Sequence, residues 1–572
     1  MLRRACSLSL CLSLWMVAGQ TAEPETPGMQ AYNAIQALRQ QSNKLIGDGH
    51  DPQAICKAVG YLDEAIGMLD RADVDELGNG NIYLKYRRWD VEMDLAQAYA
   101  ALGDNDAALK HIEAAVRFHS ISYSVADLIK GRPGLAALQS DPRFQRVMQD
   151  QRAIEQIWKH STIATAYTDT LTPEQRVAGL SLFWSEGNFN FVYFDHITDV
   201  DWDKAYLQFV PQVLAAQTTH DYYDVMMRFA PLLRDGHTNI YPPEKIASQF
   251  LARPPIETAL VDDRVLVLEV ASPTVAKLGV HAGDEIVSID AQPVRDYAQA
   301  RVRPYVSSGT PQDADVRTYS YQLLSGDESR PVVLTLRDGR ANEHTATVDR
   351  RSYADTHWTE RPFYRDLGRG VAYVNVDEFN DDHVDAQFEK AWPRIRAAKA
   401  LVIDARDNGG GSSQYGLTIL TYLTNLPINT LLSKQRQYRP VSRAHGSASI
   451  EWQALDHRPF PNDRKDVFTG KVVVLIGPKT FSAGEDFVAA LQLMRRGKLI
   501  GERTGGGTGQ PLTFELPGGG TARICAKRDE YPDGHTFVGS GIAPDIEVKA
   551  TVADVRAKRD PALARAMAEV LR

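Results

Sequence analysis

After residue 370, short apolar segments rich in β-branched residues alternate with helical segments. The apolar segments read VAYVNV (371–376), ALVIDAR (400–406), VVVLIG (472–477) and LIGERT (499–504). Strands that alternate with helices in this way predict an α/β layer around a mainly parallel sheet. In such sheets the loops carry the chemistry, so the segments that follow these strands are the first place to look for a site.

Ser482 lies where one of these apolar segments turns into a helix. In the segment VVVLIGPKTFSAGEDFVAAL (472–491), its backbone is at the helix N-terminus, where an oxyanion is stabilised and the hydroxyl is exposed. This position predicts a nucleophile. Alternatively, Ser482 caps the helix, with Glu485 three residues later completing an S-x-x-E capping box.

Two glycine-rich segments follow other strands of the expected sheet. The first, Gly409–Gly411 within ALVIDARDNGGGSS, would let backbone approach a substrate closely and present N–H groups to it. The second, GERTGGGTGQ (501–510), would line the same cleft. The alternative is that each segment is a plain turn or loop.

Length and charge limit the remaining possibilities. A chain of 572 residues exceeds what one core organises, so several domains are expected. A formal charge of -9 argues against a nucleic-acid partner. The sequence contains no H-E-x-x-H or paired C-x-x-C pattern, so we expect no metal and no cofactor.

The first 22 residues have the form of a secretory signal. They combine Arg3 and Arg4 with an apolar run that is short for a membrane span. We therefore expect export to the periplasm or the medium, with no membrane span after removal; a non-cleaved anchor is the alternative. Cys56 and Cys525 would remain, and a disulfide between them is possible but cannot be inferred.

The part of the chain before residue 250 has helical periodicity. Within residues 28–150, DLAQAYAALGDNDAALKHIEAAV resembles a tetratricopeptide repeat, which implies a protein or peptide partner; a plain helical bundle is the alternative. Residues 165–250 are also helical, and their dense aromatic side chains are typical of a core.

Residues 255–350 resemble a PDZ domain of the kind found in bacterial proteases. The segment VLVLEVASPTVAKLGVHAGDEIVSIDAQPV (265–294) shows a strand, a short helix, a turn and a hairpin, with Leu278, Gly279, Gly283, Asp284 and Ile286 at the matching positions. The resemblance implies a groove for a peptide terminus or an extended strand.

ARDNGGG (405–411), FSAGED (481–486), GERTGGG (501–507) and GIAPDIEV (541–548), in this order, resemble the C-terminal processing (tail-specific) serine peptidase family and its tricorn-like branch. The resemblance implies a crotonase-like α/β core at 360–550, interrupted upstream by the PDZ-like domain and followed by a C-terminal helix at 551–572. It also implies an oxyanion hole made by the backbone N–H groups of Ala483 and of Gly409 or Gly410.

The residue that activates the serine differs between branches of that family. The processing-peptidase branch uses a lysine in T-x-G-K-G, whereas this chain has TGGGTG (504–509) there. Lys498 comes too early in the chain, and Arg503 stays charged, so neither is a base. The tricorn-like branch uses a histidine that RDGHTNI matches at His237, and an imidazole can accept and return the serine proton. His535 is the rival and has the context of a loop residue.

The group that orients His237 is the point at which this chain departs from the family. The family has a serine before the histidine and a glutamate before the G-x-G-[VI]-x-P-D motif, where this chain has Gly236 and Val538. Either the enzyme is a Ser/His dyad, or an acidic side chain orients the imidazole by another route. The candidates for that second role are Asp235, Glu485 and Asp533.

Together these observations predict an exported serine endopeptidase or carboxyl-terminal processing peptidase that acts on polypeptides, with PDZ-like and repeat domains recruiting substrate or partner. Two alternatives stay open. One is a catalytically inactive peptide- or ligand-binding protein, since the fold also occurs in retinoid-binding relatives. The other is an acyl-thioester enzyme, which export and a PDZ-like domain disfavour.

Overall fold

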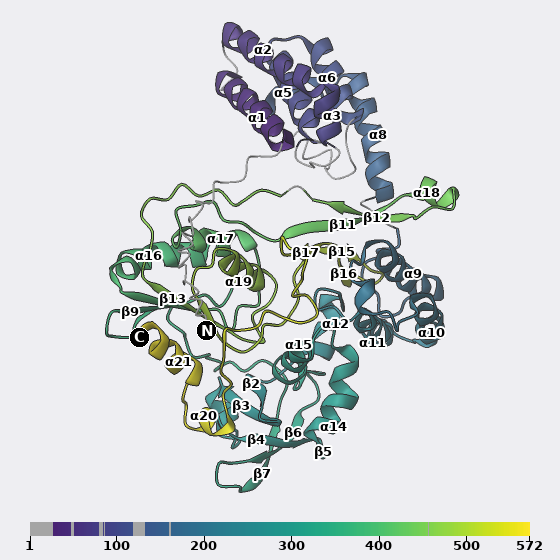
Figure 1. Ribbon diagram of the computed structural model, residues 1–572. Helices are drawn as coiled ribbons and strands as arrows, with labels where there is room; N and C mark the ends of the chain where they lie inside the picture. Colours follow the sequence, from purple (N-terminus) through teal and green to yellow (C-terminus); the bar gives the residue numbers. More distant parts are fainter. Residues whose placement is uncertain are drawn as a thin grey trace, which may run out of the picture.

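The computed structural model describes residues 27–46, 51–78, 84, 86–117, 132–158, 162–455 and 457–572 (Figure 1). The expected signal segment, residues 1–22, lies outside the described residues. Within these ranges, no helix combines the length and the apolar character that a membrane crossing requires.

The described residues between 27 and 158 form a helical region, which Figure 1 shows as a separate group of helices at the top of the view. Its helices are α1 (Pro27–Ile46), α2 (Pro52–Leu69), α3 (Ala72–Gly78), α5 (Arg87–Ala101), α6 (Asn105–Arg117), the 3₁₀ helix η1 (Pro133–Leu138) and α8 (Pro142–Trp158). The small residues Ala96 and Ala108 are buried where α5 packs on α6, and Gly103 turns the chain between them with φ 77°. The expected helix pair with its glycine turn is thus present.

A second helical region leads to the site. It contains α9 (Pro173–Asn190), α10 (Trp202–Ala215) and α11 (Thr219–Phe229), with short 3₁₀ turns η2 (Phe194–His196) and η3 (Ala230–Leu233). Its aromatic side chains form the expected core; Trp202 stacks on Phe229 with ring centroids 4.6 Å apart. Arg234 then ends η3 in the left-handed conformation, with φ 46°, and redirects the chain into strand β1 (Asn239–Tyr241). Helix α12 (Glu244–Leu251) follows.

The next segment forms an antiparallel sheet with its own core, in the strand order β2-β3-β4-β6-β7, with β5 paired to β4. Its strands are β2 (Ile256–Val261), β3 (Arg264–Val270), β4 (Glu285–Ile289), β5 (Gln292–Pro293), β6 (Val332–Arg337) and β7 (Glu343–Val348). Its helical turns are α13 (Pro273–Ala276), α14 (Val294–Tyr297), η4 (Ala298–Val302), η5 (Arg303–Tyr305), α15 (Pro311–Asp315) and η6 (Val316–Gln322). Figure 1 places this sheet on the opposite side of the core from the first helical region.

The central sheet has the order β18-β14-β13-β10-β9-β8, and all its pairings are parallel except the one to β8. Its strands are β8 (Tyr364–Asp366), β9 (Val371–Asn375), β10 (Ala400–Asp404), β13 (Lys471–Ile476), β14 (Lys498–Gly501) and β18 (Ile546–Glu547). The mainly parallel sheet predicted from the alternating segments is confirmed.

Helices cover both faces of this sheet. Leu401 and Ile403 of β10 share a core with α16 (His383–Ala397), α17 (Ser413–Thr421) and α19 (Ala483–Leu493). Ala400 and Val402 point to the other face and pack with α21 (Pro561–Val570). Burial on both faces explains why these strands are continuously apolar.

Two small antiparallel sheets complete the fold. One has the order β1-β16-β15, with β15 (Pro511–Glu515) and β16 (Thr521–Cys525); the other has the order β12-β11-β17, with β11 (Leu432–Tyr438), β12 (Ile450–Ala454) and β17 (Arg528–Glu530). Helix α18 (Pro440–Ala444) lies between β11 and β12.

The C-terminal segment differs from the single helix expected at 551–572. It forms two helices, α20 (Val552–Arg556) and α21, because Asp560 caps a new helix that begins at Pro561. The Asp560 carboxylate accepts a hydrogen bond from the Leu563 N–H at 2.9 Å.

Candidate active site

Ser482 lies at the carboxyl end of the parallel strand β13, immediately before α19. Its backbone has φ 55° and ψ -125°, a conformation that is rare for a residue with a side chain and costs about 1–3 kcal/mol. The Ser482 N–H donates to the Gly507 carbonyl at 2.9 Å, which helps to hold this turn. A serine in a strained strand-to-helix turn presents its hydroxyl outward, as a nucleophile requires.

The capping-box interpretation of Ser482 is wrong. The Ser482 hydroxyl makes no capping hydrogen bond, because the positive φ turns it away from the helix. The Glu485 carboxylate instead accepts hydrogen bonds from the Thr504 hydroxyl and, at 2.8 Å each, from the Gly506 and Gly507 N–H groups. Glu485 therefore supports the glycine loop that fixes Ser482.

His237 reaches Ser482 from a segment 245 residues earlier in the chain. Its Nε2 lies 2.9 Å from the Ser482 Oγ, within direct hydrogen-bond reach. The imidazole stacks on Phe481, with ring centroids 4.8 Å apart and an interplanar angle of 22°. His535, the rival base, pairs with Asp533 through an exposed side chain and does not approach Ser482 in this way.

The electrostatic surroundings keep the His237 imidazole neutral. Burial, together with the nearby positive charges of Arg523, Arg317 and Lys527, lowers its pKa from 6.5 to about 3. Only 4% of the residue is exposed, and its Nδ1 has no hydrogen-bond partner among the described residues. If Nε2 is to accept the serine proton, the ring must carry its own proton on Nδ1.

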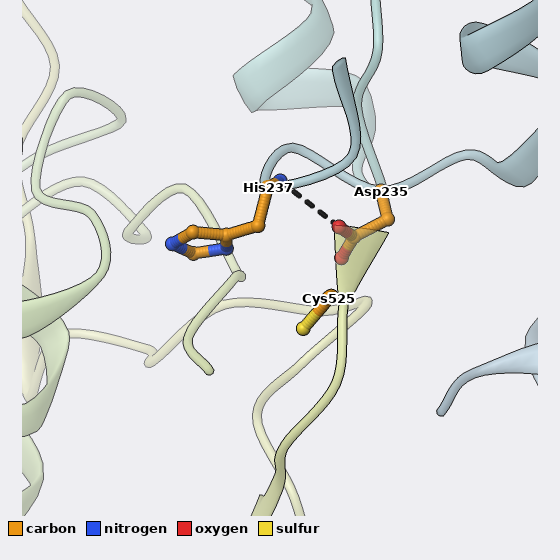
Figure 2. Close-up of side chains that lie close together, drawn as sticks. All are labelled: Asp235, His237 and Cys525. Atoms are coloured by element: carbon orange, nitrogen blue, oxygen red, sulfur yellow. Dashed lines mark hydrogen bonds between the residues drawn. The ribbon is translucent and has the colours of Figure 1, made fainter. Parts of the chain in front are cut away.

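Asp235 supports the backbone of His237 rather than its ring, as Figure 2 shows. The Asp235 carboxylate accepts a hydrogen bond from the His237 N–H at 2.9 Å and another from the Thr238 hydroxyl at 2.9 Å. Burial raises the pKa of Asp235 from 3.8 to about 6 in spite of these bonds. The carboxylate thus shapes the turn that carries the imidazole.

Asp533 and Glu485 do not orient the imidazole either. Asp533 is exposed and pairs with His535, while the Glu485 carboxylate is bonded to the 504–507 loop. Residue 236, where the family has a serine, has no room for a side chain in this structure. A Cβ on Gly236 would lie 2.7 Å from both the Arg317 guanidinium and the Phe481 ring.

Asp235, His237 and Cys525 are the described residues whose ligand atoms are close enough to consider a metal ion, all within 4.8 Å of one another (Figure 2). The surroundings oppose this use. The Asp235 carboxylate already accepts two hydrogen bonds, burial raises the pKa of the Cys525 thiol well above its usual value, and three cations act on His237. A metal would have to displace protons in a positive environment.

Cys56 and Cys525 are both free thiols, so the disulfide left open by the sequence is not formed.

Of the three N–H groups considered for the oxyanion hole, two are available as donors. Among the described residues, the Ala483 and Gly409 N–H groups have no acceptor, whereas the Gly410 N–H donates to the Asn408 Oδ1 at 2.9 Å. Gly410 has a different role, because it lets the loop approach the nucleophile. Its φ is 105°, and a Cβ there would lie 2.7 Å from the Ser482 Cβ. Gly410 is thus a close-packing position rather than a free donor.

Glu485 gives a stability prediction. Burial raises its pKa from 4.5 to about 8, despite the hydrogen bonds it accepts. Substitution Glu485→Ala would leave two buried backbone N–H groups without an acceptor, so the free energy of unfolding should fall by about 3–5 kcal/mol, as measured by chemical denaturation. The control Glu515→Ala, at an exposed position of β15, should change it by less than about 0.5 kcal/mol. Equal effects of the two substitutions would contradict this role for Glu485.

The cleft in front of Ser482 has a volume of about 650 Å³ and combines glycine backbone with charged side chains. The charged or titratable residues that line it include His237, Arg317, Asp377, Glu378, Lys479 and Arg523. Sequence reasoning did not identify Asn408, Phe481 or Arg523. Asn408 lies within the recognised ARDNGGG segment and Phe481 precedes the serine, so both positions carried a signal; Arg523 lies in an ordinary strand and carried none.

The chain is similar to known processing peptidases. Residues 370–548 match the family model described as Peptidase family S41. The chain is 23% identical over 357 residues to a chloroplastic C-terminal processing peptidase of Tetradesmus obliquus, covering 60% of this chain and 71% of that protein. It is 26% identical over 351 residues to a carboxyl-terminal-processing protease of Picosynechococcus sp., covering 58% of this chain and 73% of that protein.

The fold is similar to that of a solved structure as well. Mature CPAF complexed with lactacystin superposes with a TM-score of 0.53 at 14% sequence identity, covering 70% of this chain and 97% of that one. At this identity the similarity concerns the fold alone.

Proposed function

We propose that this chain, a hydrolase of the peptidase class with a Peptidase family S41 domain over residues 370–548, cleaves polypeptides through an acyl-enzyme on Ser482. The observation that carries the proposal is the 2.9 Å separation of the His237 Nε2 from the Ser482 Oγ. His237 takes the serine proton as Oγ attacks the peptide carbonyl. The N–H groups of Ala483 and Gly409 stabilise the oxyanion.

The same imidazole serves the later steps. Protonated on both nitrogens after the attack, it gives a proton to the leaving amine, and a water molecule then hydrolyses the ester with His237 as base. Since no carboxylate bonds to Nδ1 among the described residues, we assign a Ser/His dyad. Asp235 is a positioning residue that acts through the His237 backbone.

The other parts of the chain take supporting roles in this proposal. The sheet β2-β3-β4-β6-β7 is a PDZ-like domain that recruits a peptide segment, and the helices of residues 27–158 are tetratricopeptide-like repeats that hold a partner or substrate. The central sheet is the crotonase-like core, and residues 1–22 direct export.

Covalent labelling tests the proposal against a binding protein on the same fold. A fluorophosphonate should modify the intact protein once, and mass spectrometry should place the adduct on Ser482. Labelling elsewhere, or no labelling under conditions where a known serine peptidase reacts fully, would favour the binding protein.

The lowered pKa of His237 predicts an unusual pH profile. Because the folded pKa, about 3, lies below the ordinary value of 6.5, the base stays neutral between these values, where an ordinary histidine would be protonated. The rate of acylation by a fluorophosphonate should therefore stay within about twofold between pH 5 and pH 8. A loss of rate centred near pH 6.5 would contradict it.

The same shift affects stability with a defined sign. Between pH 6.5 and 3 the unfolded state binds the His237 proton and the folded state does not, so this group favours folding less as the pH falls through that window. The labelling experiment should therefore be accompanied by a measurement of folded fraction at each pH.

A further inference from the structure

Arg523 lies in the wall of the Ser482 cleft that carries His237. Arg523 lies in the middle of β16, which is the central strand of the sheet β1-β16-β15. It pairs with Asn239 of β1 on one side and with Thr513 of β15 on the other, and it lines the cleft. Its partner in β1, Asn239, is two residues after His237, and both His237 and Arg523 line the cleft. Arg523 is thus within the reach of a substrate bound at Ser482.

This arginine differs from the other cations of the cleft in having no acidic partner. Arg317 pairs with Asp313 at 2.8 Å, and Lys479 pairs with Glu257 at 2.6 Å and Asp407 at 3.3 Å. Arg523 forms no ion pair with the described residues, and its buried Nε has no hydrogen-bond partner. The contact found for it is with the Tyr241 ring, 5.5 Å from the guanidinium carbon. A buried donor without an acceptor is unfavourable, and a bound acceptor would remove that cost.

The chemistry of acyl transfer tells which part of a substrate Arg523 meets. His237 must give its proton to the leaving amine, so the chain that follows the scissile bond lies on the His237 side of the cleft. Arg523 is on that side, because its partner Asn239 is two residues after His237. Arg523 therefore faces the leaving-group residues.

Beside the glycine loop, where the Phe379 N–H donates to the Gly410 carbonyl at 2.9 Å, the cleft carries negative charge that is unpaired among the described residues. Asp377 and Glu378, which directly precede Phe379, are exposed, line the cleft and form no ion pair with the described residues. The closest donors to them are amides, from Asn375 at 3.0 Å and Asn380 at 2.7 Å. Repulsion from these carboxylates disfavours an acidic group beside the glycine loop, whereas the positive charge of Arg523 favours one at its own position in the cleft.

We propose that Arg523 binds a carboxylate of the substrate on the leaving-group side of the scissile bond. A guanidinium matches a carboxylate with two parallel hydrogen bonds. The carboxylate is either an acidic side chain close after the bond or the free terminus of a short tail. This inference rests on the proposed peptidase function and adds a substrate class to it.

Four matched quenched-fluorescence peptides test the inference on the full chain. They share one sequence and carry either Glu or Gln two residues after the cleaved bond, each with a C-terminal acid or amide. If Arg523 binds the side-chain carboxylate, kcat/KM of the unaltered protein should be about ten- to a hundredfold higher for the Glu peptide than for the Gln peptide. If it binds the terminal carboxylate, the same difference should separate the acid from the amide. The Glu/Gln pair and the acid/amide pair identify the two sources separately.

Substitution Arg523→Gln should remove this preference, so that kcat/KM becomes the same for the charged and the neutral peptide of each pair. Arg523→Lys should keep part of the preference, since a point charge remains without the planar fork. Arg340→Gln, in an exposed turn between β6 and β7, removes the same charge at a distance and should change nothing.

Two results would overturn the inference: an unchanged preference in Arg523→Gln, or an equal loss for charged and neutral peptides. Fluorophosphonate labelling of Ser482 is measured in parallel. If Arg523→Gln labels normally without changing selectivity, the carboxylate site is wrong and the peptidase proposal stands. If the unaltered protein does not label, the peptidase proposal fails first.

Discussion

Ser482→Ala should reduce peptide cleavage by a factor of roughly 10⁴ to 10⁶, because it removes the hydroxyl that lies 2.9 Å from the His237 Nε2 and that would form the acyl-enzyme. The backbone should be retained, since alanine occupies the positive-φ position of Ser482 at the same cost as serine. The measurement is kcat/KM for a cleaved peptide, with far-UV circular dichroism and thermal unfolding to confirm the fold. Fluorophosphonate labelling should disappear with the cleavage.

Ser447→Ala is the matched control, because it removes an exposed hydroxyl near α18, outside the residues that line the cleft. It should cleave and label as the unaltered protein does. Ser482→Gly adds a second test of the site's geometry. Glycine adopts positive φ without penalty. The free energy of unfolding of this inactive variant should therefore be about 1 kcal/mol higher than that of Ser482→Ala. A folded Ser482→Ala variant with full activity would sink the mechanism.

His237→Ala should lower kcat/KM by a factor of roughly 10³ to 10⁶, since the serine would then lack a base and the leaving amine an acid. His535→Ala removes the exposed histidine that pairs with Asp533 and should leave activity unchanged. Comparing the two substitutions separates a role in proton transfer from a general effect of losing an imidazole.

The double variant Ser482→Ala/His237→Ala tests whether the two residues act together. Groups that act as a unit lose their activity together, so the double variant should be no less active than Ser482→Ala alone. Additive losses would mean that His237 contributes to stability or substrate binding rather than to the activation of Ser482.

Local sequence patterns predicted the parts of this site that depend on one segment. The alternation after residue 370 predicted the parallel sheet, and the strand-to-helix turn predicted an outward serine at 482. His237 came from the RDGHTNI motif, and the structure brings it to Ser482. Each of these depends on periodicity or on a contiguous motif, which a single sequence displays directly.

The features that sequence missed depend on contacts between distant segments. Glu485 has the spacing of a capping box, but donors from residues 504–507 compete for its carboxylate. Gly410 and Gly409 are indistinguishable in sequence, and only the Asn408 side chain shows which N–H is free. Arg523 looks like any strand arginine until its missing partner is seen.

The separation of 245 positions between His237 and Ser482 also constrains when these two residues can meet. During synthesis the histidine leaves the ribosome first, and the serine follows only after the sheet β2-β3-β4-β6-β7 and the strands β8, β9, β10 and β13 of the central sheet have been made. Strand β18, at one edge of the central sheet, and helix α21, which covers one of its faces, come last. Until Ser482 has been made, a growing chain therefore lacks the partner of His237, and the proposed nucleophile and base cannot meet.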